Sequence, residues 1–146
     1  MNKIKVYIAA SYTAHALAEE VANILEPYCE VVSTWHKPEN VVDDDNLDVW
    51  DAHQRACVDL SQIRYCDCLL YLSTPHPSKG GRDFEMGYAY ALGTRVFRFG
   101  HTTHIFSCGK GSTFFGAFLG IYPEVQPVYT AIRAAIDKHV AELEQV

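Results

Sequence analysis

The sequence has no long hydrophobic run and carries more acidic than basic side chains. None of its apolar stretches approaches the roughly 18 residues that a membrane-spanning helix requires, so we expect no membrane segment. Lysines near the start precede apolar residues, but the largely polar stretch 11–15 follows too soon for a signal peptide. The formal net charge is −6, whereas a protein that binds a nucleic acid polymer usually presents a basic face. We therefore expect neither a membrane nor a nucleic acid polymer as a partner, while a single nucleotide needs only local donors.

The sequence also lacks a disulfide framework and any metal-binding spacing. Its cysteines are Cys29, Cys57, Cys66, Cys68 and Cys108. An odd number without regular spacing, in a chain long enough to bury a core, predicts reduced thiols and a cytoplasmic protein. Cys66 and Cys68 form the one close pair, with no second pair nearby to complete a zinc site. The histidines show no metal spacing either, so we predict no metal.

Glycine is missing where a dinucleotide-binding fold would need it. Residues 9–13, which follow the first predicted strand, read Ala-Ala-Ser-Tyr-Thr without the glycine fingerprint of NAD-binding proteins. The pair Gly80 and Gly81 follows a later strand and lacks the Gly-Lys-Ser/Thr ending of a P-loop. NAD binding and nucleoside triphosphate hydrolysis are therefore both disfavoured.

Strands and helices are predicted to alternate along the chain. Its 146 residues, 49% of them hydrophobic, suit one domain covering residues 1–146. Apolar runs predict strands over 5–10, 30–35, 68–72, 96–99 and 125–128. Helical spacing predicts helices from Thr13 to Pro27 and over 47–65, 81–93 and 130–144. This alternation predicts a parallel five-stranded sheet with helices on both faces.

The helix predicted over 47–65 should turn an apolar stripe toward the core. Members of this stripe are Val49, Trp50, Ala56, Leu60 and Ile63. The acidic run 43–45 before it is interpreted as a solvated loop, because a calcium loop would also require glycine and a distal acid.

The segment 80–89, Gly-Gly-Arg-Asp-Phe-Glu-Met-Gly-Tyr-Ala, follows a predicted buried strand and opens a helix. Its glycines would let backbone N–H groups approach a ligand. The helix N-terminus would stabilise negative charge on that ligand and on Glu85, which we place in the first turn. Ligands of parallel sheets bind beyond the carboxyl ends of the strands. Residues 7–11, Trp35 and residues 73–85 should therefore gather at one edge of the sheet.

This edge would combine Glu85, Tyr7, several hydroxyls and Asp59 from the preceding helix. The set suits glycosyl chemistry, in which one carboxylate attacks an anomeric carbon and a second acid protonates the departing group. Such a reaction requires no metal, and we predict no cofactor. The residues alone leave other interpretations open: Glu85 as a helix-capping acid, Asp59 on a solvated helix face, and Tyr7 in the core.

Several stretches together resemble the nucleoside 2-deoxyribosyltransferase superfamily, which includes 2'-deoxynucleoside 5'-phosphate N-hydrolases. They are Val-Tyr-Ile-Ala-Ala-Ser at 6–11, Asp-Leu-Ser-Gln-Ile at 59–63, Cys-Asp at 66–67, Gly-Arg-Asp-Phe-Glu-Met-Gly-Tyr-Ala at 81–89, and Leu-Gly at 92–93. The resemblance covers most of the chain, and the order and spacing of the motifs are more specific than any one of them.

The resemblance implies a flavodoxin-like (Rossmann-like) fold and a nucleoside or nucleotide as substrate. Glu85 would be the nucleophile on C1' of 2-deoxyribose, Asp59 would bind the sugar or base and assist proton transfer, and Tyr7 would position the nucleophile. Family members complete their pockets across subunits. This implies a homodimer or higher homo-oligomer, with Ser107 and its neighbours lent to the adjacent subunit.

The residues carry signals for both outcomes, transfer of the sugar to a base and transfer to water. Ser11 matches a phosphate-binding serine of the hydrolases, and Ser78 and Ser107 match others once gaps are allowed. Thr13, however, stands where the hydrolases carry a basic residue. The best-known transferases end in an aromatic segment that this chain replaces with a charged helix over 131–146. Residues 80–85 and 105–106 look more like phage-encoded members, usually labelled transferases, so we predict transfer first and hydrolysis second.

The remaining predictions concern substrate contacts. Trp35 either stacks on the nucleobase or packs in the core, and Arg82 either reaches a phosphate or stays solvated. The predicted substrate-binding residues are Ser11, Trp35, Ser78, Gly80, Gly81, Arg82, Asp83 and Ser107. A non-catalytic nucleotide-binding module is the alternative from another functional class, and a flavin-binding domain is a weaker one.

Overall fold

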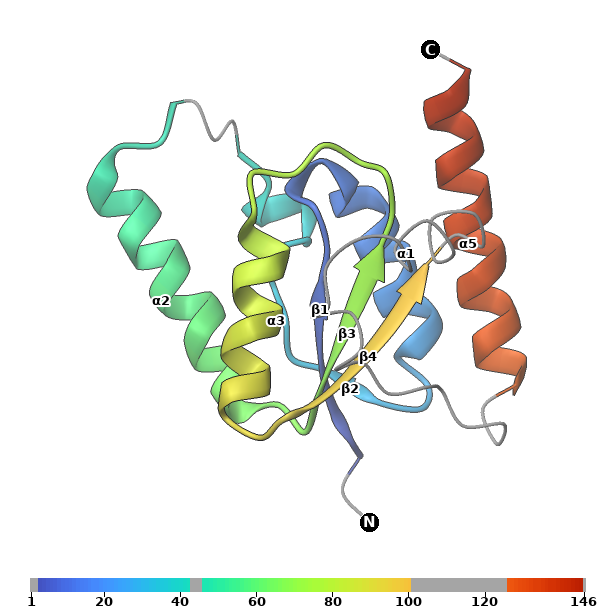
Figure 1. The fold of residues 1–146 in the computed structure, drawn as a ribbon, viewed down its shortest axis with the longest axis horizontal. Helices are drawn as coiled ribbons and strands as arrows, with labels where there is room; N and C mark the ends of the chain where they lie inside the picture. The colour runs from blue at the N-terminus through green and yellow to red at the C-terminus, as the bar shows by residue number, and fades with distance from the viewer. Residues whose placement is uncertain (1–2, 43–45, 101–125, 146) are drawn as a thin grey trace.

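The computed structural model describes residues 3–42, 46–100 and 126–145. Its strands are β1 (Lys5–Ala9), β2 (Glu30–Val31), β3 (Cys68–Ser73) and β4 (Arg95–Gly100). Its α-helices are α1 (His15–Leu25), α2 (Val49–Tyr65), α3 (Gly81–Ala91) and α5 (Gln126–Glu144), and two short 3₁₀ helices are η1 (Tyr12–Ala14) and η2 (Pro38–Asn40). Figure 1 shows helices on both faces of a central sheet. None of the described helices is long and apolar enough to cross a bilayer.

The sheet is parallel, and its strand order is β2-β1-β3-β4. This is the order of the flavodoxin-like class, so the predicted α/β architecture is confirmed at that level. The described residues contain four strands instead of the predicted five. The strand predicted over 125–128 is wrong because Gln126–Glu144 is helical. Val128, Ile132 and Ile136 are buried at helical spacing, so this apolar run belongs to a helix face.

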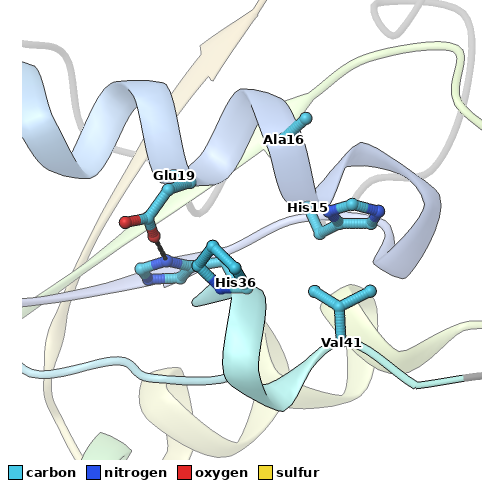
Figure 2. Close-up of a pocket in the computed structure, with 6 residues that line it drawn as sticks. His15, Ala16, Glu19, His36 and Val41 are labelled. Carbon is cyan, nitrogen blue, oxygen red and sulfur yellow. Dashed lines mark hydrogen bonds and ion pairs between the residues drawn. The ribbon is translucent and has the colours of Figure 1, made fainter.

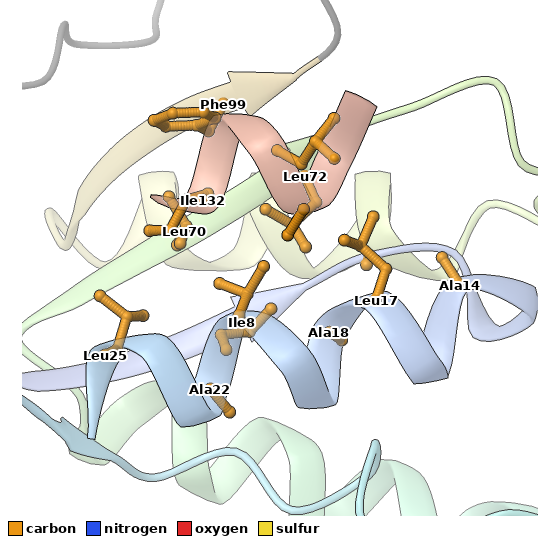
Figure 3. Close-up of a cluster of buried hydrophobic side chains, with 14 of the residues drawn as sticks. Ile8, Ala14, Leu17, Ala18, Ala22, Leu25, Leu70, Leu72, Phe99 and Ile132 are labelled. Carbon is orange, nitrogen blue, oxygen red and sulfur yellow. The ribbon is translucent and has the colours of Figure 1, made fainter. Parts of the chain in front are cut away.

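Each face of the sheet packs a separate core. Along β1, Val6 and Ile8 point into the cluster that α1 and α5 cover, which Figure 3 shows in part. Tyr7 and Ala9 point to the opposite face, into the cluster that includes Ile63 of α2 and Ala89 of α3. The alternation of side chains along a strand therefore decides that Tyr7 faces α2 and α3.

Strand β2 is shorter than predicted. The predicted strand ran over 30–35, but the chain leaves the sheet after Val31. The last backbone bond to β1 is from Val32 N to Val6 O at 2.9 Å. Beyond it, the side chains of Ser33 and Trp35 take over the bonding to β1. The run of β-formers after Val31 is thus used for side-chain anchoring and not for pairing.

Helix α2 is the largest departure from the sequence-based prediction. Of the predicted apolar stripe, Val49 is 88% exposed and Trp50 is 67% exposed, while Ile63 is fully buried. Ala56 is also exposed, and Leu60 packs only partly against the core. Figure 1 shows why: the C-terminal end of α2 lies near the sheet and α3, while its N-terminal part stands away from them.

The described part of the chain contains four of the cysteines. Cys29, Cys57, Cys66 and Cys68 are all free, and Cys108 lies outside the described residues. Burial raises the pKa of Cys66 to about 11 and that of Cys68 to about 12, so both are neutral packing groups.

Candidate active site

Tyr7 and Glu85 meet between the sheet and α3. Tyr7 is fully buried on β1, and its hydroxyl donates a hydrogen bond to Oε2 of Glu85. Burial raises the pKa of Tyr7 well above its usual value, and the neighbouring Glu85 charge raises it further. Tyr7 therefore stays protonated as a hydrogen-bond donor. Tyr7 is thus a core residue, as the strand pattern predicted, and it also contacts Glu85.

Glu85 lies one turn deeper in its helix than the sequence suggested. Gly80 caps α3 with φ +99°, a left-handed conformation that favours glycine, and the helix starts at Gly81. The acid of the first turn is therefore Asp83, and Glu85 follows in the second turn. The prediction of Glu85 in the first turn is wrong because the second glycine of the pair is already helical. Glu85 depends less on the helix N-terminus than on its neighbours.

Asp59 completes a cluster of acidic groups. It is partly buried on α2, and burial raises its pKa to about 6, with Arg55 acting in the opposite direction. Burial also raises the pKa of Glu85 to about 8; the Asp59 charge adds to this, and the Tyr7 hydroxyl opposes it. The Asp59 charge likewise raises the pKa of Tyr7. These mutual effects place the three groups within electrostatic reach of one another, unlike an acid on a solvated helix face.

Two turns at the carboxyl ends of β1 and β3 are tied together by hydroxyl groups. Ser11 and Thr13 both donate to the carbonyl of Pro77, Thr13 at 2.9 Å, and their hydroxyl oxygens lie 2.9 Å apart. Ser78 Oγ accepts from the backbone N–H of Gly80 at 3.1 Å. The predicted meeting of residues 7–11 with residues 73–85 is therefore present.

The family model of nucleoside 2-deoxyribosyltransferase matches residues 6–140. The chain belongs to this family. A comparison with curated proteins gives no match. Among solved structures, the chain is similar to a conserved protein from Enterococcus faecalis V583, with 17% identity, 98% of each chain covered and a TM-score of 0.49.

Arg82 and Asp83, in the first turn of α3, bond to β3 and to the turn that follows it. Arg82 donates to the carbonyls of Leu72 at 3.2 Å and Thr74 at 3.0 Å, and its guanidinium stands 5.5 Å from the centre of the Tyr71 ring. Arg82 is thus neither simply solvated nor free, because it holds the turn after β3. Tyr71 donates to Oδ1 of Asp83 at 2.6 Å.

Tyr71 was not among the predicted site residues, although a signal for it existed. It pairs with Ala9 in the sheet, and both it and Tyr7 lie in the core cluster on the α2 and α3 side. Two buried tyrosines therefore donate to two acids of one helix, Tyr7 to Glu85 and Tyr71 to Asp83. The sequence pattern showed a tyrosine inside an apolar strand, and only the pairing of β1 with β3 puts it beside Asp83.

Trp35 lies at the junction of both cores. Its indole N–H donates to the carbonyl of Ile8 at 2.7 Å, and its ring meets the His36 ring edge-on at 5.4 Å. The ring packs against both hydrophobic clusters. Packing therefore accounts for this residue in the structure, and stacking on a nucleobase stays a prediction. Ser107 lies outside the described residues.

A separate pocket of about 510 Å³ lies on the α1 side (Figure 2). Its lining residues are His15, Ala16, Glu19, His36, Pro38 and Val41. Tyr7, Asp59 and Glu85 are not among them. Among the described residues no group of His, Cys, Asp and Glu side chains could hold a metal ion.

Proposed function

We propose that the protein breaks the N-glycosidic bond of a 2'-deoxynucleoside or its 5'-monophosphate and transfers the deoxyribosyl group to another nucleobase. The observation that carries this proposal is the cluster of Glu85, Tyr7 and Asp59 in a chain of the nucleoside 2-deoxyribosyltransferase family. A nucleophilic carboxylate, a donor that orients it and a second acid with a raised pKa are the groups that glycosyl transfer requires.

In the first step the Glu85 carboxylate attacks C1' of the sugar. A bond forms from the Glu85 oxygen to C1', the bond from C1' to the base nitrogen breaks, and its electron pair goes to the base. Asp59 supplies the proton that the departing base takes up. In the second step a nitrogen of another base attacks C1', Glu85 leaves as a carboxylate, and the proton of the incoming base returns to Asp59.

The raised pKa values suit this proton balance. With values of about 6 for Asp59 and about 8 for Glu85, the pair holds about one proton near neutral pH. These values put the proton mainly on Glu85, so the reactive form, with the proton on Asp59 and the charge on Glu85, is the less populated of the two one-proton forms. The Tyr7 hydroxyl, which donates to Glu85, raises the population of this reactive form because it stabilises the ionised carboxylate.

Hydrolysis of a deoxynucleoside 5'-monophosphate is the second candidate. The hydroxyls of Ser11, Thr13 and Ser78 gather where the turns after β1 and β3 meet, as donors for a phosphate would. Ser11 and Thr13, however, donate to Pro77, and Arg82 donates to backbone carbonyls. A phosphate would have to replace these bonds, so transfer remains the first proposal. A binding module without turnover is the remaining alternative.

The test is chromatography of the protein incubated with each deoxynucleoside and deoxynucleoside monophosphate, with and without a second free base. A new nucleoside that forms only with the acceptor supports transfer. Free base with a sugar or sugar phosphate, independent of acceptor, supports hydrolysis. Glu85→Gln should lose at least about 10³-fold in turnover, whereas the exposed Glu26→Gln should match the wild type. No turnover across the whole panel, from folded protein that binds nucleotides, would leave only the binding module.

We also propose that the protein is a homo-oligomer that associates through α2 and α3. The exposed large apolar side chains of these helices include Trp50 (67% exposed) and Phe84 (65%), together with Val49, Val58, Tyr65 and Tyr90. Apolar side chains in such number on neighbouring helices are typical of an interface. A second copy of the chain is the occupant that family membership favours, and the surface lies on the helices that carry Asp59 and Glu85.

A further inference from the structure

The edge of β1 next to Tyr7 is held by side chains and not by a strand. Val6 accepts from Val32, so its backbone groups face β2, and those of Ile8 face the same way because strand residues alternate with period two. No β2 residue lies opposite Ile8, since β2 ends at Val31. Ser33 Oγ accepts from the N–H of Ile8 at 3.1 Å, and the Trp35 indole donates to its carbonyl at 2.7 Å.

Ser33 is itself held by a buried chain of polar groups. Its hydroxyl lies 2.8 Å from Nε2 of His36, and Nδ1 of His36 lies 2.6 Å from Oε2 of Glu19. Figure 2 shows the Glu19 and His36 contact at the wall of the pocket. Ser33 and His36 are buried, with 0% and 1% exposure, so water cannot replace these partners. We call this set the Glu19–His36–Ser33 chain.

The hydrogen positions follow from the number of donors. Ser33 Oγ already accepts from Ile8, so its own hydrogen needs an acceptor, and unprotonated Nε2 of His36 supplies it. The other ring nitrogen then carries the hydrogen that is donated to Glu19. A second proton on His36 would turn Nε2 into a donor and leave the buried Ser33 hydrogen without a partner.

The surroundings of His36 favour this neutral form. Burial lowers its pKa and the charge of Lys37 adds to this effect, whereas the bond and charge of Glu19 from α1 and a backbone hydrogen bond to Ser33 oppose it. His15 lines the same pocket. The His36 ring also supports the Trp35 ring, which it meets edge-on. Both hydrogen bonds to Ile8 therefore depend on side chains that His36 contacts.

We propose that His36 is a positioning residue that fixes Ile8 through Ser33 and thereby sets the place of the adjacent Tyr7 against Glu85. The effect on turnover rests on the proposed function, whereas the effect on Ile8 does not. The Ser33 hydroxyl, which Nε2 of His36 holds in place, accepts the Ile8 N–H where β2 has ended, and His36 itself does not touch the reacting atoms.

A matched pair of substitutions tests this role. His36→Gln places an amide oxygen near the position of Nε2 and can still accept from Ser33. His36→Asn places its amide near Nδ1, so it can meet Glu19 but leaves Ser33 without an acceptor. Both remove the ring, but Asn is also one methylene smaller than Gln, so His36→Leu, which fills the space without an acceptor, separates the hydrogen bond from packing. His36→Leu should exchange Ile8 as fast as His36→Asn does. His15→Gln, in the same pocket, is the control.

Amide hydrogen exchange of Ile8 and the kinetic constants are the two measurements. His36→Asn should exchange Ile8 about tenfold faster than the wild type and lower kcat by a similar factor with KM within about twofold, because one buried hydrogen bond is lost. His36→Gln should stay within about threefold of the wild type in both. Equal impairment of the two variants, or wild-type exchange in both, would overturn the proposal.

The partly exposed Glu19 gives a second pair if substitution at the buried His36 prevents folding. Glu19→Gln keeps an oxygen acceptor for Nδ1, whereas Glu19→Ala does not. Faster Ile8 exchange in Glu19→Ala alone supports the chain, and identical exchange in both variants contradicts it. If the wild type turns over no substrate, the proposed function fails, while the Ile8 exchange still decides the role of His36.

Discussion

At the residue scale, two acids of the site hold their protons to unusually high pH. Burial is the main cause that raises the pKa of both Asp59 and Glu85, and the Asp59 charge raises the pKa of Glu85 further. In the proposed reaction, only the form of this pair with one proton combines an ionised nucleophile with an acid that can protonate the departing base. The pH dependence of turnover therefore tests the proposed roles of both acids.

The first prediction is a bell-shaped pH profile of kcat/KM, with apparent pKa values of about 6 and about 8. Activity falls at low pH because the pair takes up a second proton, and at high pH because it loses its only one. In Asp59→Asn turnover should drop by about 10² or more, and the basic limb should vanish because Glu85 then needs only to be ionised. A basic limb that persists in this variant would argue against Asp59 as the acid.

The second prediction concerns stability. Glu85 titrates near 8 in the fold instead of its ordinary 4.5, so between these pH values the folded state binds more protons than the unfolded state. The contribution of Glu85 to the free energy of unfolding is therefore fully present below its ordinary pKa and is lost as the pH rises toward 8. At pH 8, Glu85→Gln should unfold at a higher urea concentration than the wild type, and its free energy of unfolding should be higher by about 1 kcal/mol or more. The difference should shrink toward pH 4, and a constant difference would contradict the buried charge.

At the element scale, β3 and β4 approach so closely at one end that only glycine fits. Gly100 pairs with Ser73, and a Cβ added at Gly100 would lie 2.2 Å from the Ser73 carbonyl oxygen. That oxygen belongs to the backbone and cannot rotate away. Gly87 in α3 is the opposite case, because an added Cβ would meet nothing within 4 Å.

The third prediction uses these glycines as a pair. Gly100→Ala should lower the free energy of unfolding by about 2 kcal/mol or more, because the clash must move one strand. Gly87→Ala should raise it by about 0.5–1 kcal/mol, because alanine loses less backbone freedom in a helix. Urea unfolding followed by circular dichroism gives both values, and equal effects of the two changes would refute the close approach at Gly100.

At the scale of the whole molecule, the apolar side chains of α2 and α3 have no cover within the described chain. Val49 is 88% exposed on a helix whose sequence pattern is that of a core helix. A second copy packed on this face would bury the stripe and would also lie against the two helices that carry Asp59 and Glu85. Association and activity should then change together.

The fourth prediction is that the protein sediments as a dimer or larger oligomer and that Trp50→Glu shifts it toward the monomer. A charge placed at an apolar interface loses its hydration without gaining a partner. Tyr28→Glu is the matched control, because Tyr28 is similarly exposed at 60% but follows α1 and not α2 or α3. Analytical ultracentrifugation measures both. A wild-type monomer, or equal sedimentation of the two variants, would contradict an interface on α2.

The sequence by itself determined the alternation of elements, most of their positions and the candidates Glu85, Asp59 and Tyr7, because periodicity and local motifs are properties of neighbouring residues. The sequence wrongly predicted a strand over 125–128 and too long a strand at 30–35, because strand and helix patterns compete over a few residues. The predicted core position of Val49 and Trp50 was also wrong, because an apolar stripe does not say whether the same chain or another covers it.

Only the tertiary structure decided which side chains meet. The parallel pairing of β1 with β3 puts Tyr7 and Tyr71 on one face, beside Glu85 and Asp83. The early end of β2 leaves Ile8 to Ser33 and Trp35, and this gives His36 a role that no motif suggested. Contacts between residues far apart in the chain depend on strand order and register, and a linear pattern contains neither.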